Sequence, residues 1–417
     1  MIKPTYNNNA SITIIDCHPQ ILQSTCNANV NAEKENVVLK PKLHSGGISA
    51  PILKWPGGKE KELKFILPNI PQFDRYFEPF VGGGSVFMNV ESRELHINDL
   101  SSELMGLYKC IANQQSPFFD YVEAIDATWE NSKSFFREHK SELLAIYENY
   151  CGGELDTTAL KNKIHRFCEE NSASVQVITG GLLQDYVCIF FQELEKNLCR
   201  KMQRMHELSI KKSALPPKDL EENIECAIKS ALYMYYRYSY NEMATIAPNS
   251  EIHVALFFFI RNYAYSGMFR YSKGRFNVPY GGIAYNCKTM TKKLHYYRTS
   301  LLREHFSRTR FYNEDFRKFL EDAQPTKRDF IFLDPPYDSE FSTYANNLFT
   351  KSDQVRLADY LLHDCSAKWM MVIKATPFIC DLYQQRGINI RSFEKEYLVS
   401  FMNRNDKKAT HLLITNY

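Results

Sequence analysis

The stretch Ile331-Phe332-Leu333-Asp334-Pro335-Pro336-Tyr337 decides the fold. Its three apolar residues predict a buried strand of a parallel sheet, because such strands are covered on both faces. The strand has to end at the two prolines, since proline offers no N–H to a neighbouring strand. A carboxylate and an aromatic ring are left at the carboxyl end of a strand, where open α/β sheets bind their ligands. Asp334 and the Pro335 carbonyl can accept hydrogen bonds from a planar amine while Tyr337 stacks on its plane; the alternative is a plain turn after an edge strand.

The composition is that of an ordinary globular protein, with 44% hydrophobic and 24% charged residues in a chain of 417. This length suits one large domain with an insertion, or two to three domains. The net charge of +3 does not by itself indicate a nucleic-acid partner. The charge distribution does, because residues 254–303 contain nine lysines and arginines, no Asp or Glu, and several aromatic rings. Such a mixture is typical of surfaces that contact phosphates and stack on bases.

The eleven cysteines are scattered, with no CxxC pair and no His/Cys cluster at the spacing of a metal site. We therefore expect reduced thiols, a cytoplasmic protein and no metal. The N-terminus lacks the apolar segment of a signal peptide, and the longest apolar run, 254–260, is too short to span a membrane. Residues 1–45 are rich in Asn, Ser and Thr and are expected to be a poorly ordered extension, with a weak strand candidate at 11–15.

A second motif, Tyr76-Phe77-Glu78-Pro79-Phe80-Val81-Gly82-Gly83-Gly84-Ser85, predicts a strand and a glycine-rich turn, followed by a helix from Val86. Glycines let the backbone approach a ligand closely. Asp99, fourteen residues after Ser85, ends another predicted strand. A glycine loop after one strand and an acid after the next form a nucleoside site, in which the carboxylate binds the ribose hydroxyls. The loop differs from the GxGxxG of NAD enzymes, and Glu78-Pro79 argues against a dinucleotide.

The remaining segments fix the order of the elements. The motif Lys54-Trp55-Pro56-Gly57-Gly58-Lys59 can hold an anion at the head of a helix, or can be a tight turn. Residues 116–225 are expected to be mainly helical, with a capping box at Asp219 and Glu222. Further strands are predicted at 310–316, 369–373, 396–402 and 411–415, and a helix at 351–364. One helical stripe is expected to pack against its neighbours, with a partner surface as the alternative; it consists of Phe190, Leu194, Leu198, Met202, Met205 and Leu208. The tyrosines between 233 and 240 suit either core packing or base stacking.

The motifs KWPGGK, EPFVGGGS, RNYAYSGMFRY, GRFNVPYGG, NEDF, DPPY and LLITNY follow one another along the chain. With them the chain resembles the DNA adenine methylase family of AdoMet-dependent amino-methyltransferases, over roughly 50–115 and 226–417. The resemblance implies an α/β fold: a Rossmann-like class I AdoMet methyltransferase sheet with a target-recognition domain and a mainly helical insertion. It assigns 46–115 and 304–417 to the catalytic AdoMet-binding domain, 116–225 to the insertion and 226–303 to DNA target recognition.

The resemblance also implies S-adenosyl-L-methionine (AdoMet) as cofactor and double-stranded DNA as substrate, with a cognate restriction enzyme or a protein docked on 116–225 as further candidate partners. The implied catalytic residues are Asp334, Pro335, Pro336 and Tyr337. The implied cofactor-binding residues are Trp55, Lys59, Phe80, Gly82, Gly84, Asp99, Asp315, Phe316 and Asp334. The implied DNA-binding residues are Lys54, Tyr265, Ser266, Arg270, Arg275, Asn277 and Pro279. Ser266 departs from close relatives, which carry Asn there.

These residues predict a mechanism. A paired adenine cannot present its amine to a methyl donor, so it has to be flipped out of the duplex. Asp334 is expected to orient the amine and accept its hydrogen bond rather than to remove a proton before attack, and no metal is needed. Arg270 can contact guanine, and Arg275, Lys288, Lys292 and Lys293 can contact phosphates.

Four alternatives remain at this point. A cytosine-N4 methylase usually carries Ser in place of Asp334, and a protein glutamine methylase typically carries Asn-Pro-Pro-Tyr. The other two are an inactive DNA-binding relative and an assembly subunit. The DNA target is not predicted by the sequence; GATC is only the family's common choice.

Overall fold

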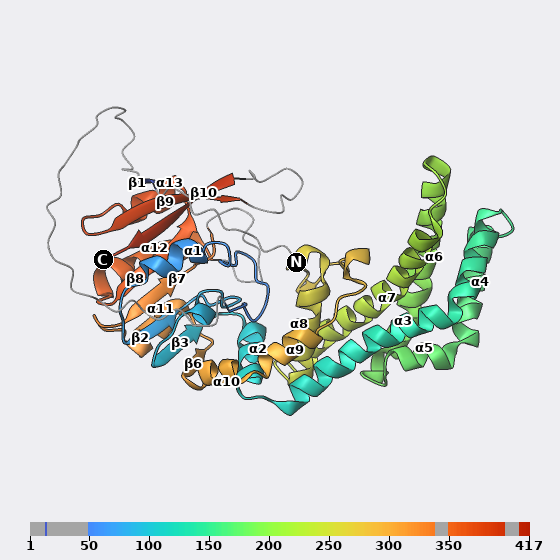
Figure 1. Cartoon of the computed structure of the whole chain (residues 1–417), viewed down its shortest axis with the longest axis horizontal. Coiled ribbons are helices and arrows are strands. Elements are labelled where there is room, and N and C mark those ends of the chain that lie inside the picture. Colours follow the sequence, from blue (N-terminus) through green and yellow to red (C-terminus); the bar gives the residue numbers. More distant parts are fainter. Residues whose placement is uncertain (1–12, 15–48, 338–348, 397–407) are drawn as a thin grey trace, which may run out of the picture.

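A mixed sheet forms one half of the molecule (Figure 1). The computed structural model describes residues 13–14, 49–337, 349–396 and 408–417. The strands of the sheet are β1 (Thr13–Ile14), β2 (Arg75–Glu78), β3 (Glu94–Asn98), β6 (Thr309–Tyr312), β7 (Phe330–Leu333), β8 (Lys368–Lys374), β9 (Asn389–Glu396) and β10 (Lys408–Thr415). Their order is β1-β9-β10-β8-β7-β2-β3-β6. The strands from β8 to β6 pair in parallel, whereas β10, β9 and β1 pair antiparallel to their neighbours. The predicted α/β class is confirmed.

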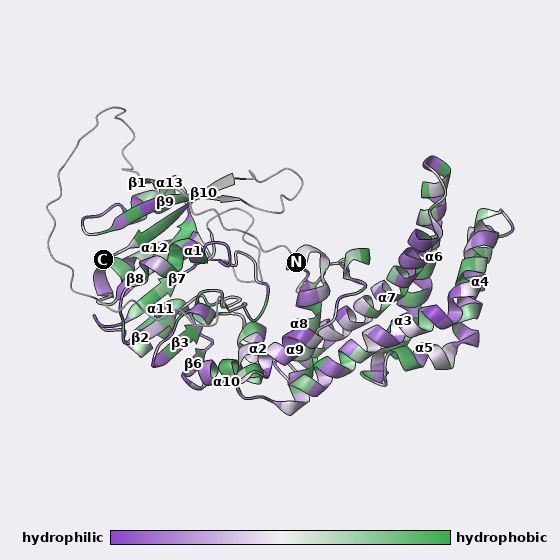
Figure 2. Cartoon of the chain, viewed as in Figure 1, coloured by the Kyte–Doolittle hydropathy of each residue, from purple (hydrophilic) through white to green (hydrophobic). Residues whose placement is uncertain are grey.

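Strand β7 lies in the middle of this sheet and is buried on both faces. Phe330 and Phe332 belong to one hydrophobic cluster, and Ile331 and Leu333 belong to a second cluster on the opposite face. All four side chains are fully buried. The continuous apolar run therefore has the cause inferred from the sequence, since alternate side chains of a strand point to opposite faces. Figure 2 shows hydrophobic residues along the central strands.

Helices cover the two faces of the sheet. They are α1 (Leu63–Ile66), α2 (Ser102–Ala112), α10 (Ser300–Ser307), α11 (Phe316–Ala323), α12 (Lys351–Asp359) and α13 (Pro377–Tyr383). Thr350 begins α12 with a capping box, in which Thr350 and Asp353 bind each other's backbone N–H. A π-helical turn (Tyr360–Asp364) continues α12, so the helix predicted at 351–364 is confirmed.

Four boundaries differ from the predictions. Strand β6 ends at Tyr312, so the strand predicted at 310–316 is too long, and Phe316 instead begins α11. The segment that begins near Val86 forms a single 3-10 turn (Phe87–Asn89) rather than a longer helix. Strand β9 (Asn389–Glu396) begins seven residues earlier than the strand predicted at 396–402. It includes the predicted strand residue Glu396, and the other predicted residues, 397–402, lie outside the described residues. The weak strand candidate in the N-terminal extension is present at Thr13–Ile14; the rest of 1–45 lies outside the described residues.

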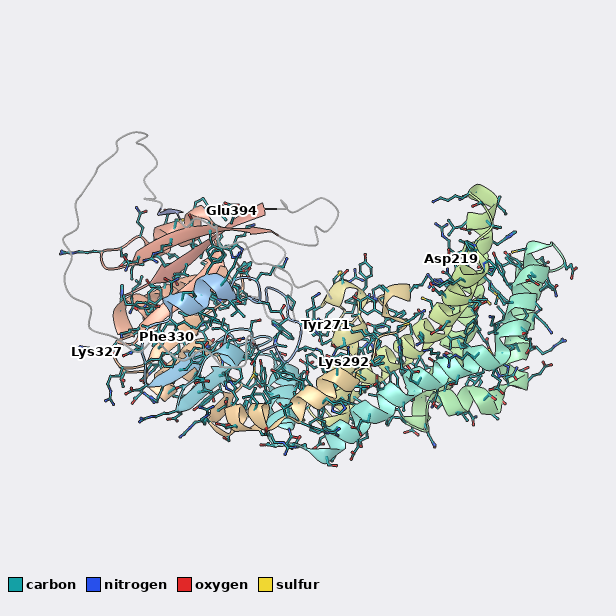
Figure 3. All side chains as sticks on the ribbon, in the orientation of Figure 1. Asp219, Tyr271, Lys292, Lys327, Phe330 and Glu394 are labelled. Carbon is teal, nitrogen blue, oxygen red and sulfur yellow. The ribbon has the colours of Figure 1, made fainter. Side chains whose placement is uncertain are left out.

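A long helical arm extends from the sheet, to the right in Figure 1. Its helices are α3 (Ser116–Cys151), α4 (Thr157–Glu170), α5 (Ser172–Ile178), α6 (Val187–Lys211) and α7 (Pro217–Ile246). Between arm and sheet lie α8 (Glu251–Tyr263), the hairpin of β4 (Tyr271–Ser272) and β5 (Arg275–Phe276), and α9 (Thr291–Tyr297). Every residue of α8 from His253 to Tyr263 is buried, so α8 is the central helix of this region. Tyr271 and Lys292 mark this middle part in Figure 3.

The helical insertion predicted at 116–225 is helical, and its stripe packs internally. Phe190, Leu194, Leu198, Met202 and Met205 are buried and Leu208 is half-buried, where α6 contacts α4 and α7. Tyr233, Tyr235, Tyr236 and Tyr240 are likewise buried, so these tyrosines serve the core rather than a stacking surface.

Two details of the arm differ from expectation. The predicted capping box at Asp219 and Glu222 is wrong, because α7 already begins at Pro217, whose missing N–H costs nothing in the first turn. The boundary predicted between 225 and 226 falls inside α7. One hydrophobic cluster runs from the sheet through α8 into the arm, so insertion and recognition region share a core.

Every cysteine in the described part of the chain is free, as expected. Within the same part, no helix combines the length and the hydrophobicity needed to cross a membrane.

Candidate active site

The DPPY turn lies at the carboxyl end of β7, as predicted. Asp334 and Tyr337 are half-buried, Pro335 is buried and Pro336 is exposed. Gln354, a fully buried residue of α12, donates a hydrogen bond from Nε2 to the Pro336 carbonyl at 2.8 Å. This hydrogen bond fixes the DPPY turn to helix α12. Sequence reasoning missed Gln354, whose only signal was a polar residue on the apolar side of a helix.

Lys59 joins this turn from a distant part of the chain. Its ammonium group forms an ion pair with Asp334 and also donates to the Tyr337 hydroxyl at 3.2 Å and to the Gly57 carbonyl at 3.0 Å. Only 2% of Lys59 is exposed. The ammonium stabilises the carboxylate as an anion. The structure thus brings Lys59 of the KWPGGK motif into contact with Asp334 and Tyr337 of the DPPY motif.

The glycine loop follows β2 and packs tightly against protein. Gly82 and Gly84 have φ values of +49° and +78°, which side chains rarely adopt. A Cβ atom on Gly83 would lie 2.3 Å from the Leu53 carbonyl oxygen, and one on Gly84 would lie 2.4 Å from the Tyr108 hydroxyl. The glycines are therefore required first for packing of the loop, a role that the sequence analysis did not assign to them.

Replacing Gly84 with alanine is expected to destabilise the protein more than replacing Gly153. Both glycines have positive φ, +78° and +84°, but nothing lies within 4 Å of a Cβ at Gly153, whereas Gly84 faces Tyr108. The clash should lower the free energy of unfolding by a further ~1–3 kcal/mol. Urea unfolding of both variants measures the difference, and equal losses would show that only backbone strain matters at Gly84.

Asp99 lies beside this loop at the end of β3. Its carboxylate accepts hydrogen bonds from the backbone N–H groups of Gly82 (3.0 Å) and Ser101 (2.9 Å). Burial raises the pKa of Asp99 to about 6, although both N–H groups act in the opposite direction. Asn98 ties the neighbouring strand ends together, because its side chain bonds the Pro79 carbonyl at 3.1 Å and both polar backbone groups of Glu314.

Asp315 and Phe316 lie at the end of β6, along the same edge of the sheet. Asp315 caps α11, and Arg356 of α12 binds it through both terminal nitrogens at 2.8 and 3.4 Å. Phe316 forms an aromatic cluster with Phe80 and Phe349, with ring centroids 5.5–5.7 Å apart. The rings are tilted or perpendicular to one another, so they form an apolar cluster beside the Asp315 carboxylate.

Glu78 is a buried acid that sequence reasoning did not select. It accepts a hydrogen bond from the Tyr76 hydroxyl at 2.6 Å. Burial is the main reason that the pKa of Glu78 lies well above its ordinary value, and the negative charge of Asp334 adds to it. The signal of Glu78 in the sequence was an acid directly before the proline of the glycine motif.

Apart from Lys54, the predicted DNA-binding residues lie on the loops and the hairpin after α8. Tyr265 is 49% exposed and is fixed by a hydrogen bond from its backbone N–H to the Pro279 carbonyl at 2.9 Å. Ser266 has a φ of +53°. Asn tolerates this left-handed conformation better than Ser, so the Asn that the resemblance implies at this position would fit the turn with less strain.

Arg270, Asn277 and Pro279 lie together and are exposed. Arg270 donates to the Asn277 carbonyl at 2.7 Å, and Arg237 of α7 supports the same loop by donating to the Val278 carbonyl at 3.3 Å. Arg237 was missed because it lies 40 residues away in the arm. Arg275 instead forms an ion pair with Glu242 at 2.5 Å, so its charge is partly neutralised by the protein.

Arg261 connects the segment of Lys54 and Trp55 with the turn that follows Tyr265. It is 2% exposed and donates to the carbonyls of Lys54 (3.1 Å), Gly267 (3.1 Å) and Met268 (3.2 Å). Its guanidinium group lies 5.1 Å from the centre of the Trp55 ring. Burial lowers the pKa of Arg261 to about 10, so it stays charged at neutral pH. Sequence reasoning counted it only as one cation of the basic span.

Comparison with known proteins agrees with this geometry. A family model described as D12 class N6 adenine-specific DNA methyltransferase matches residues 55–179 and 183–399. The chain belongs to this family, and it is therefore an enzyme that methylates adenine in DNA. This assignment rules against the cytosine and glutamine alternatives.

Curated relatives carry matching names. The chain is 25% identical to the Type II methyltransferase M.CviBI of Paramecium bursaria Chlorella virus NC1A, over 88% of this chain and 99% of that protein. It is 23% identical to the Type II methyltransferase M1.LlaDCHI of Lactococcus lactis subsp. cremoris, over 88% and 95%. A shorter match of 72 residues, 17% of this chain and 25% of the relative, is 38% identical to the DNA adenine methylase of Escherichia coli K12.

Proposed function

We propose that the protein binds AdoMet along the carboxyl edge of its sheet and transfers the methyl group to the N6 amine of an adenine flipped out of double-stranded DNA. The observation that carries the proposal is the contact of Lys59 with both Asp334 and Tyr337, directly beside the glycine loop. One charged acceptor, one aromatic ring and one fixed cation meet at the end of β7, an arrangement that supports binding of a flipped base there.

The residues present fit AdoMet. Asp99 offers a carboxylate for ribose hydroxyls, and the half-buried ring of Phe80, packed against Phe316, offers an apolar contact for an adenine ring. Trp55, Lys59 and Asp315 complete the proposed cofactor site. When bound, AdoMet supplies an electrophilic methyl group.

The chain's own residues would then position the amine. Asp334 and the Pro335 carbonyl each accept a hydrogen bond from one N–H group of the adenine amine. These hydrogen bonds favour a more tetrahedral and more nucleophilic nitrogen. Tyr337 stacks on the flipped base, at ~1–3 kcal/mol per base, and offsets part of the cost of unstacking. Positioning supplies most of the acceleration in such a site.

AdoMet affinity is expected to rise about tenfold between pH 5 and pH 7. Because the pKa of Asp99 is about 6, its carboxyl is mostly protonated at pH 5 and ionised at pH 7, and the ionised form is the stronger acceptor for ribose hydroxyls. Isothermal titration calorimetry across this range tests it, with Asp99→Asn as the pH-independent control. A flat profile in the wild type would contradict the role of Asp99.

For DNA, we propose that Tyr265 enters the stack where the base leaves and that Arg270 reads a guanine. The exposure of Tyr265 and the fixed position of Arg270 beside Asn277 support these roles. The names of the Type II relatives suggest, as a further proposal, a role beside a restriction enzyme. A protein partner of the arm and the cytoplasmic location stay predictions.

The test is transfer of a labelled methyl group from AdoMet to unmethylated genomic DNA, followed by nucleoside analysis. We expect label in N6-methyladenine alone. Label in N4-methylcytosine, or in protein, would overturn the proposal.

A further inference from the structure

Three lysines lie at the junction between the cofactor segment and the recognition region. Lys54 precedes α1 and is exposed, whereas Lys288 and Lys293 come from the loop before α9 and from α9 itself and are half-buried. Lys54 is separated from the other two lysines by more than 230 residues of chain, which include the whole arm. Their grouping could not be read from the sequence.

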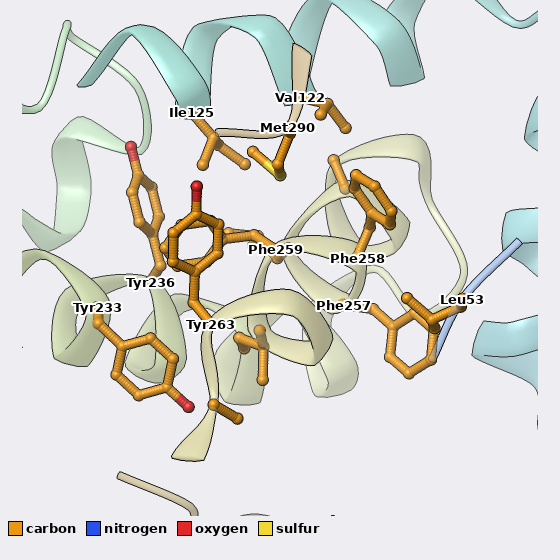
Figure 4. Close-up of a cluster of buried hydrophobic side chains, with 14 of the residues drawn as sticks. Leu53, Val122, Ile125, Tyr233, Tyr236, Phe257, Phe258, Phe259, Tyr263 and Met290 are labelled. Atoms are coloured by element: carbon orange, nitrogen blue, oxygen red, sulfur yellow. The ribbon is translucent and has the colours of Figure 1, made fainter. Parts of the chain in front are cut away.

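The backbone of this junction is held firmly. Tyr296 donates to the Ala50 carbonyl at 2.9 Å, and Tyr297 and Lys293 both donate to the Ile52 carbonyl, Lys293 at 3.5 Å. Leu53 belongs to the buried cluster with Phe257 and Phe258 of α8 (Figure 4). Helix α9 is thereby fixed to residues 50–54.

Aromatic rings support the two half-buried ammonium groups. Lys288 donates to the Asn262 carbonyl and lies 5.4 and 5.0 Å from the ring centres of Tyr263 and Tyr285. Lys293 lies 5.6 Å from the ring centre of Phe258. Ring faces attract a cation but do not neutralise its charge.

The positive charges of this cluster are not balanced. None of the three lysines forms an ion pair with a residue that the structure describes. Burial lowers the pKa of Lys288 to about 8, helped by Lys54; burial also lowers that of Lys293 to about 8, helped by Lys288 and Arg261 and opposed by Glu60. A bound anion would relieve this repulsion.

We propose that Lys54, Lys288 and Lys293 form one binding site for a phosphodiester group of the DNA backbone, beside the point where the target base leaves the duplex. The inference rests on the proposed function. A Cβ atom on Gly267 would lie 4.0 Å from Cδ of Lys54, so the cluster borders the turn that carries the exposed Tyr265. Lysine is a point charge that suits a phosphate, and a backbone held here would keep the flipped nucleotide in register.

The double variant Lys288→Gln/Lys293→Gln tests the site in the full-length protein. On a DNA duplex, the slope of log binding constant against log salt concentration should become shallower by about 0.9, the value expected when one phosphate is no longer neutralised. Affinity should fall on the order of tenfold, equally for target and non-target duplexes. AdoMet affinity should remain that of the wild type.

Two further variants separate the site from general charge. Lys54→Gln changes an exposed side chain and should reproduce part of the slope change without a risk to folding. Lys292→Gln removes an exposed charge next to Lys293 in α9 and should change the slope less than half as much as the double variant. Thermal unfolding checks that all variants fold.

The outcomes distinguish this site from the proposed function. An unchanged slope in both Lys54→Gln and the double variant, with N6-methyladenine still formed by the wild type, would overturn the phosphate site alone. Weaker AdoMet binding with an unchanged slope would also overturn the phosphate site. It would indicate that the lysines bind the carboxylate of AdoMet instead. If the wild type itself neither binds DNA nor forms N6-methyladenine, the proposed function fails instead.

Discussion

Replacing Asp334 with alanine is expected to reduce kcat for methyl transfer by roughly 10²–10⁴-fold, because the amine loses its charged acceptor in a preorganised site. AdoMet or DNA binding should persist at least in part. Single-turnover transfer and AdoMet titration measure the two effects separately. Full turnover in the variant would remove Asp334 from the mechanism.

The ion pair with Lys59 complicates this variant, and a second substitution resolves the complication. Lys59 is 2% exposed, so Asp334→Ala leaves a buried ammonium group without its carboxylate and should cost ~3–5 kcal/mol of stability. Lys59→Met/Asp334→Ala replaces the pair by apolar groups and should recover most of that stability but none of the activity. Recovery of activity would mean that the single variant was only unfolded.

Replacing Arg261 with methionine is expected to weaken AdoMet and DNA binding together. The variant leaves three carbonyls without their donor, at Lys54, Gly267 and Met268, and should lower the free energy of unfolding by roughly 2–5 kcal/mol. The same substitution removes the side chain that links Trp55 to the turn after Tyr265. Urea unfolding and titrations with AdoMet and with DNA measure the three effects.

Lys229→Met is the matched control for Arg261. Lys229 is equally buried, donates to the Asn286 carbonyl at 2.6 Å and lies 5.0 Å from the centre of the Trp129 ring, but it touches neither the cofactor segment nor the turn. The Lys229 variant should be less stable while its AdoMet affinity stays unchanged. An equal decrease of AdoMet affinity in both variants would show that Arg261 only stabilises the core and has no specific role in binding.

Local patterns predicted the sheet well because each pattern had one cause. The apolar run before Asp334 needed burial on both faces, and the prolines had to end it. The acids and glycines that follow β2, β3, β6 and β7 could then be predicted to lie together, since parallel strands bring their carboxyl ends to one edge of a sheet. The residues gathered there were therefore predictable as a group.

Contacts over long sequence distances were not predictable. Gln354, Arg237 and Arg261 donate hydrogen bonds to backbone carbonyls of distant segments. The hydrophobic periodicity of the sequence does not indicate such partners. The capping box at Asp219 failed because two prolines specified an earlier helix start. The family resemblance implied a boundary between 225 and 226, whereas α7 runs across this point with one continuous buried face.

The most direct test of the account is nucleoside analysis of DNA from methylase-deficient cells that express the wild type or Asp334→Ala at equal levels. We predict N6-methyladenine at one recurring sequence in the wild-type DNA and its absence in the variant. N6-methyladenine at equal levels in both samples, or none in the wild type despite AdoMet binding, would contradict the assignment of the Lys59, Asp334 and Tyr337 site.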